Sequence, residues 1–138
     1  GTETPRAKLD IIGETRFEAY SEIVQVVTSS SGEVDLDLSR GQNFEITTTE
    51  NITAFNLLNI TSGTTRSYTI KITQDSSTAY TVDVDTYRLD GGSELSCNWP
   101  GGIIPTVTNV AGKTDIYSFM TFDGGTTIFG VVGGQNFS

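Results

Sequence analysis

Apolar and polar residues alternate along several short stretches of this chain. Residues 34–38 read Val, Asp, Leu, Asp, Leu, and a similar alternation recurs in residues 67–73 and 78–85. A period of two places successive side chains on opposite faces of a strand. Each stretch therefore predicts a strand with one buried and one solvated face. From about residue 20 onward such stretches alternate with turn residues at the spacing typical of a β-sandwich or barrel.

Turn residues predict how two pairs of these strands connect. Residues 67–73 and 78–85 are separated by the sequence QDSS, which favours an antiparallel hairpin. Residues 115–122 and 126–133 flank the sequence DGG, a stronger turn because Gly accepts a positive φ without steric cost.

The second of these hairpins departs from simple alternation. Both of its strands carry large apolar residues on both faces. Only one face of a sheet is dry in a two-layer sandwich, so the second face is expected to meet another subunit. The alternative is a loop of the same chain that folds back over this face. The residues assigned to the subunit interface are Tyr117, Phe119, Phe129 and Val131.

Composition agrees with an all-β fold. Thr, Ser, Gly, Val and Ile are abundant, and Ala, Leu, Lys and Glu are sparse. The 138 residues suffice for one domain with its own core. We therefore predict an antiparallel, jelly-roll-like β-sandwich over residues 20–138. Residues 1–19 are more charged, too short to bury their own apolar side chains, and expected to form a connector.

Charge excludes several kinds of partner. The net charge is −9 and the isoelectric point is about 4.2, which opposes binding to nucleic acid or to an anionic membrane. No stretch approaches the roughly 20 apolar residues of a membrane span, so no membrane insertion is expected. Because the sequence opens on Gly1 rather than Met, we expect it to be cut from a longer protein.

The residues offer little for catalysis. The chain has no His and a single Cys, Cys97, so no Ser-His-Asp or Cys-His arrangement can form within it. Nothing in the sequence brings two carboxylates into a cleft for glycoside hydrolysis. We predict that the protein is not an enzyme and uses no cofactor, and that Cys97 packs as a small hydrophobic residue.

Two pairs of aspartates could share a hard cation. Asp35 with Asp37, and Asp83 with Asp85, lie two residues apart and so point to one face of a strand. Calcium needs six to eight oxygen ligands from several segments, and neither pair comes with an Asp-rich loop. A solvated acidic face is the preferred interpretation, and no metal site is predicted.

Two segments resemble parts of phage structural proteins. The sequence GTETPRAKLDIIGETRF is similar to a shaft repeat that precedes the end domain in trimeric phage tail fibres. The segment from Trp99 to the end resembles the C-terminal part of a domain widespread in phage structural proteins, particularly those of marine cyanophages. Residues 19–63 carry neither pattern. The matching residues are Ile72-Thr73-Gln74-Asp75, Trp99-Pro100-Gly101-Gly102, Pro105, Asp115, Tyr117, Phe119, and residues 123–126 and 134–136.

The resemblance implies a virion protein that forms a homotrimer. Residues 1–19 would then continue a fibre shaft, and residues 20–138 would form its C-terminal tip, which attaches to a host surface glycan or protein. Other virion proteins would be its remaining partners. The alternative is a capsid decoration or head-fibre protein with a purely structural, trimerising role. A glycan depolymerase ranks far below both.

Three residues are candidates for receptor binding. Tyr87 and Arg88 belong to a loop, residues 87–96, that is longer than the resemblance leads one to expect. The alternative is an ordinary variable surface loop. Trp99 could stack on a sugar, but its place in a recurring turn favours a structural role at the end of the sandwich.

Overall fold

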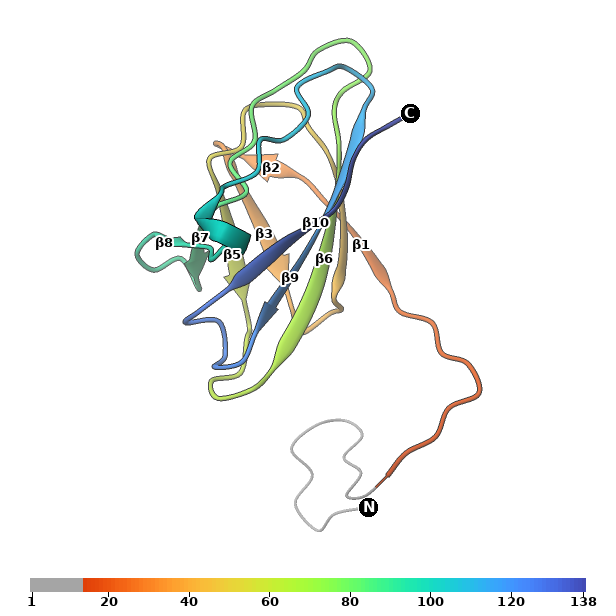
Figure 1. Cartoon of the computed structure of the whole chain (residues 1–138), viewed down its shortest axis with the longest axis vertical. Helices are drawn as coiled ribbons and strands as arrows, with labels where there is room; N and C mark the ends of the chain where they lie inside the picture. The colour runs from red at the N-terminus through yellow and green to blue at the C-terminus, as the bar shows by residue number, and fades with distance from the viewer. Residues whose placement is uncertain (1–13) are drawn as a thin grey trace.

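The computed structural model describes residues 14–138, which form ten strands and one short 3₁₀ helix (Figure 1). No helix among these residues is long and apolar enough to cross a membrane. The elements are β1 (Val24–Val27), β2 (Ser29–Ser30), β3 (Glu33–Asp37), β4 (Asn43–Thr47), β5 (Ala54–Leu58), β6 (Arg66–Thr73), β7 (Thr86–Leu89), β8 (Leu95–Ser96), η1 (Pro100–Gly102), β9 (Thr114–Thr121) and β10 (Phe129–Phe137).

The strands form two five-stranded sheets, and the predicted all-β sandwich is confirmed. Sheet A has the order β1-β4-β6-β9-β10, and sheet B has the order β2-β3-β5-β7-β8. The purely antiparallel, jelly-roll-like arrangement is wrong. In the described residues the pairs β1–β4, β4–β6, β3–β5 and β5–β7 are parallel.

The parallel pairs arise because the chain changes sheets between successive long strands. From β3 to β7 it passes from sheet B to sheet A and back twice. A strand that returns to its sheet after one excursion to the other runs in the same direction as its predecessor, whereas a tight hairpin would reverse it. Only the C-terminal part, β6–β9–β10, and the short pairs β2–β3 and β7–β8 are antiparallel.

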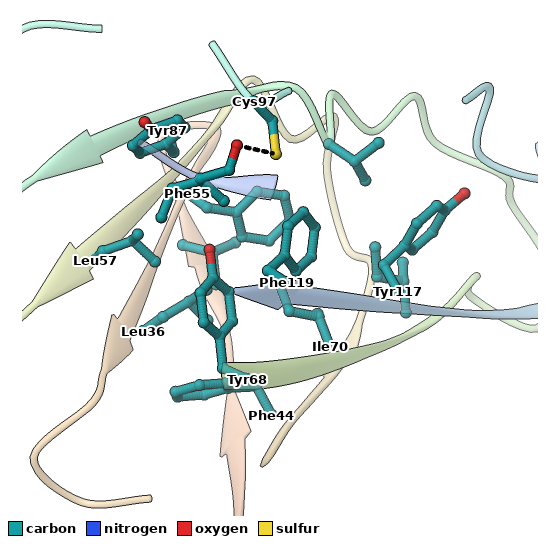
Figure 2. Packing of buried hydrophobic residues seen from close by; sticks show 14 of the residues in the cluster. Leu36, Phe44, Phe55, Leu57, Tyr68, Ile70, Tyr87, Cys97, Tyr117 and Phe119 are labelled. Atoms are coloured by element: carbon teal, nitrogen blue, oxygen red, sulfur yellow. Dashed lines mark hydrogen bonds between the residues drawn. The ribbon is translucent and has the colours of Figure 1, made fainter. Parts of the chain in front are cut away.

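The core lies between the two sheets and contains the apolar sets that alternation predicts. Residues 34, 36 and 38 from sheet B and residues 68, 70 and 72 from sheet A are all buried. Figure 2 shows Leu36, Tyr68 and Ile70 among the side chains of this cluster. Tyr68 stacks on Phe119, with ring centroids 5.1 Å apart. Periodicity alone thus identified the buried face of these strands.

The predicted hairpin of residues 67–73 and 78–85 is wrong. β6 pairs instead with β4 and β9, and Val82 bridges to Ile52 beside sheet B. The buried side chain of Gln74 explains the change of direction: its amide bonds both backbone groups of Tyr80 and also reaches Thr108 O and Thr48 Oγ1. Gln74 therefore satisfies backbone groups that a hairpin ladder would otherwise pair.

The C-terminal hairpin is confirmed. β9 and β10 are antiparallel neighbours, and the turn contains Gly124 and Gly125 at φ of 78° and 95°. Asp123 Oδ1 accepts hydrogen bonds from Thr121 Oγ1 and from the amide of Thr127, each 2.9 Å long. The turn is thereby held rigid at the end of sheet A.

Candidate interaction surface

The outer face of the β9–β10 hairpin presents apolar side chains to solvent. Within β9 the odd-numbered residues 115–121 point into the sandwich, and the even-numbered residues point outward. Register pairs Phe129 with Met120, so both lie on the outer side. Phe122 meets Phe129 edge to face, with centroids 6.3 Å apart. We call this surface the hairpin face; its residues are Ile116, Met120, Phe122, Phe129 and Val131.

Four large apolar side chains of the hairpin face are exposed to solvent. The exposed fraction is 38% for Met120, 63% for Phe122, 43% for Phe129 and 42% for Val131. Contiguous apolar surface of this kind is uncommon on a monomer unless something covers it. Scattered single apolar residues would need no such explanation.

The hairpin also lacks exposed charge on its strands. Between residues 114 and 138 the only acidic or basic side chains are Asp115 and Asp123. Asp115 is buried, and Asp123 lies in the turn. Edge strands are commonly protected by charged side chains, but β10, an edge strand of sheet A, carries none. The start of β10 is covered by residue 98, through the bridge between Asn98 and Phe129, and the pairing of β10 with β9 is irregular at residues 132–134 and 134–137.

A buried carboxylate anchors the end of β10. Asp115 accepts hydrogen bonds from the amides of Thr108 (2.7 Å) and Asn136 (2.8 Å), and also from Tyr117 Oη and Gln135 Nε2, both at 3.1 Å. Burial by itself would raise the pKa of Asp115, but these hydrogen bonds to the ionised form outweigh it and lower the pKa. The carboxylate thus joins β10 to the preceding loop as a fixed, charged acceptor.

The structure separates the four residues predicted at the subunit interface. Phe129 and Val131 lie on the hairpin face. Tyr117 and Phe119 point the other way and belong to the core, with 0% and 4% exposure, so they are not available to another chain. Tyr117 and Phe119 share one parity in β9, and it is the packing of the two sheets that makes this parity the buried one. A contact with another subunit remains a prediction for the exposed residues.

The structure corrects the expected exposure of Tyr87. Its side chain is buried, with 5% exposure, and its hydroxyl donates to Thr126 O at 3.2 Å. Tyr87 lies on the inner side of β7 (Figure 2). The opposite sheet covers this position, which cannot be seen from the residues of the loop alone.

Arg88 lies on the outer face of sheet B within a row of paired side chains. Its guanidinium contacts Glu33 at 2.5 Å and Glu94 at 2.7 Å. Next in the row, Asn56 Nδ2 donates to Glu33 and to Asp35. Arg88 and Asn56 are in register on adjacent strands, and among the described residues Arg88 Nε and Asn56 Oδ1 are buried without a hydrogen-bond partner. The guanidinium of Arg88 is therefore held by ion pairs with Glu33 and Glu94.

The side chain of Trp99 is buried in the core. It is 7% exposed, and its Nε1 donates to Asp85 Oδ1 at 2.9 Å. Its ring meets Tyr117 and Phe119 edge to face, with centroids 6.3 and 5.7 Å apart. Such a ring offers no open face for stacking on a sugar.

All four carboxylates of the two aspartate pairs accept hydrogen bonds from other residues of the chain. Asp83 accepts from the amides of Asp85 and Thr86, and Asp37 accepts from Ser39 and Asn59. Throughout residues 14–138, no three His, Cys, Asp or Glu side chains gather closely enough to hold a metal ion. The acidic pairs thus act as turn and ladder acceptors.

Comparison with known proteins adds no assignment. No protein-family model, curated protein or solved structure matches the chain. The likeness to phage fibre proteins therefore rests on the sequence motifs alone.

Proposed function

We propose that this chain is a self-associating β-sandwich that caps a phage fibre as a homotrimer in the virion. The exposed, uncharged hairpin face is the observation that carries the self-association. The fibre and the number of subunits come from the sequence resemblance. The cap could attach to a host or serve a purely structural role. The structural role has the better support, because Tyr87 and Trp99, two of the three residues predicted to bind a receptor, are buried.

Electrostatics favours this face as the place where copies meet. Each chain carries a net charge of −9, so identical copies repel each other over most of their surface. The strands of the hairpin face carry no exposed charge, and depletion of charge is typical of the centre of an interface. Burial of its apolar side chains would offset the residual repulsion.

The oligomeric mass tests the proposal. The intact chain at tens of micromolar, measured by light scattering, should show three times the 14.8 kDa of one chain. The double variant Phe129→Asp, Val131→Asp should shift the mass to that of a monomer. Thr47→Asp, on the exposed end of β4 in the same sheet, serves as a matched control and should leave the trimer intact. A monomeric intact chain would overturn the proposal.

Host attachment is a second candidate function, and one observation favours a particular end of the molecule. The loops between β6 and β7 and between η1 and β9 stand at the top of Figure 1, at the end of the sandwich away from residues 14–23. A hollow of about 310 Å³ lies there, lined by residues 81–84, 104–107 and 109. Ile104, which lines the hollow, is 54% exposed, and its sequence neighbour Ile103 is 75% exposed.

Binding of labelled chain to host cells tests attachment. Ile104→Asp should abolish the binding, while Arg88→Gln on sheet B should not change it. Absence of binding by the intact chain would leave only the structural role.

A further inference from the structure

An N-terminal arm leaves the sandwich with its apolar side chains uncovered. We call residues 14–23 the arm; in Figure 1 it runs away from the body below β1. Every residue of the arm is exposed. Phe17, Tyr20 and Ile23 are 68%, 77% and 70% exposed, which is more than any residue of the hairpin face. The arm therefore has large apolar side chains that no part of residues 14–138 covers.

The odd- and even-numbered residues of the arm form two unlike sets of side chains, and the backbone bends at Glu18. The odd-numbered set contains Phe17, Ala19, Ser21 and Ile23 and no charge. The even-numbered set contains Arg16, Glu18 and Glu22 together with Tyr20. A strand with one uncharged and one charged side is typical of a segment that lies on a surface with one side toward water.

The arm and the hairpin face lie at opposite edges of the same sheet. The arm continues into β1, one edge of sheet A, and β10 is the other edge. The ten residues of the arm span roughly 33 Å when extended, and the nine residues of β10 span about 30 Å. A donor at one edge and a receiver at the other make a head-to-tail contact, which can close into a ring of identical copies.

We infer that the uncharged side of the arm, centred on Phe17 and Ile23, packs on the hairpin face of a neighbouring copy of this chain. The inference rests on the proposed self-association and adds the segment that covers the apolar face. Arg16 and Glu18 stay in water, and Glu22 keeps its hydrogen bond from Asn43 Nδ2 of its own chain. Each copy gives one arm and receives one, so no hairpin face in a closed ring is left bare.

Crosslinking between differently labelled chains tests the contact. One full-length chain carries Ala19→Cys and another carries Val131→Cys. The two are mixed through a cycle of dissociation and reassociation, and then treated with a short bis-maleimide. Each variant has only one exposed thiol, because Cys97 is buried, so a 19–131 link must join two chains. Mass spectrometry of the linked peptides should find this link at least tenfold more often than links from two controls, Glu18→Cys with Val131→Cys and Ala19→Cys with Thr47→Cys.

A second pair of variants measures the contribution of the apolar side chains. Phe17→Ser with Ile23→Ser should raise the concentration at which the oligomer dissociates at least tenfold. Arg16→Ser with Glu18→Ser, which changes the other face of the arm, should not. All these positions are exposed, so an unchanged circular dichroism spectrum is expected and serves as the check on folding.

The outcomes separate this inference from the proposed function. An oligomer that shows no 19–131 link and is unaffected by the Phe17 and Ile23 changes overturns the inference alone. A monomer in which a single chain bearing both cysteines links internally shows that the arm covers its own hairpin. That result overturns the inference and the self-association together.

Discussion

The indole ring of Trp99 lies directly over Gly130. A Cβ built at Gly130 would come within 2.6 Å of Trp99 Cη2 and Cζ3. The neighbouring backbone is bonded as well, since the amide of Gly130 donates to Asn98 O at 3.0 Å. This contact couples the loop that carries Trp99 to the strand that presents the hairpin face.

Gly130→Ala should destabilise the sandwich through this contact. The ring cannot move aside easily, because Tyr117, Phe119 and Asp85 hold it. Overpacking of a filled core costs about 1–3 kcal/mol, which should appear as a lower urea midpoint. In a double-mutant cycle, the same substitution in a Trp99→Phe background should cost less. Equal costs in the two backgrounds would mean that Trp99 is not the obstacle.

Asp115→Asn should loosen the end of β10. The amide keeps the shape but places an NH₂ group among four donors, and loss of a hydrogen bond to a charged acceptor costs about 1.5–3 kcal/mol. Amide hydrogen exchange should accelerate at residues 134–137 before it does so elsewhere in sheet A. Asp75→Asn, in an exposed turn with Ser77 and Thr78, is the matched control and should not affect β10.

Acid should destabilise the protein. Hydrogen bonds hold the pKa of three aspartate carboxyls below 3.8. The main donor is Asn59 for Asp37, Ser77 for Asp75 and the Thr127 amide for Asp123. The pKa of the buried Asp115 is also lowered. A carboxyl whose pKa is lower in the folded state stabilises it above the unfolded value and ceases to do so as the pH falls through the folded value. Urea midpoints should therefore be steady near neutrality and fall below about pH 4.

The same titration carries its own control. Asp115→Asn removes one of these carboxyls, so its stability should decrease less steeply with acid than that of the unchanged chain. Parallel curves for the two proteins would contradict the assigned role of Asp115.

The thiol of Cys97 should be inert in the folded protein. It is buried beside Ile128 O, at 3.6 Å (Figure 2). Burial, with a smaller contribution from the Asp85 carboxylate, raises the pKa of Cys97 to about 12. Because the thiolate is the reactive form, a colourimetric disulfide reagent at pH 8 should react only as fast as the chain unfolds. Rapid labelling of the native chain would show that this part of the core opens readily.

Most of the buried face of the long strands could be predicted from sequence. Leu36 and Ile70 are buried because alternation sorts their side chains from their polar neighbours, and this sorting does not depend on which strand lies alongside. The DGG turn acts locally in the same way. The same rule places Tyr117 and Phe119 on one face of β9, but both faces carry large apolar residues, so alternation does not decide which face is buried.

Alternation could not predict which strands pair with each other, nor which aromatic side chains are buried. A strand shows the same alternation in a parallel or an antiparallel pair, so the pattern before Gln74 was compatible with a hairpin. The buried Gln74 amide instead directs the chain toward the other sheet. The sequence around Tyr87 is typical of an exposed loop. Tyr87 is nevertheless buried, because the opposite sheet covers its side chain.

The sequence by itself determined that this chain is an acidic β protein with a net charge of −9, and that its C-terminal hairpin carries large apolar side chains on both faces. These are local properties of spacing and residue type. The tertiary structure decided which residues that hairpin exposes, which strands run parallel, and that Trp99 and Tyr87 serve the core. Each of these depends on contacts between segments far apart in the chain, where packing and backbone hydrogen bonding select one partner among several that alternation allows.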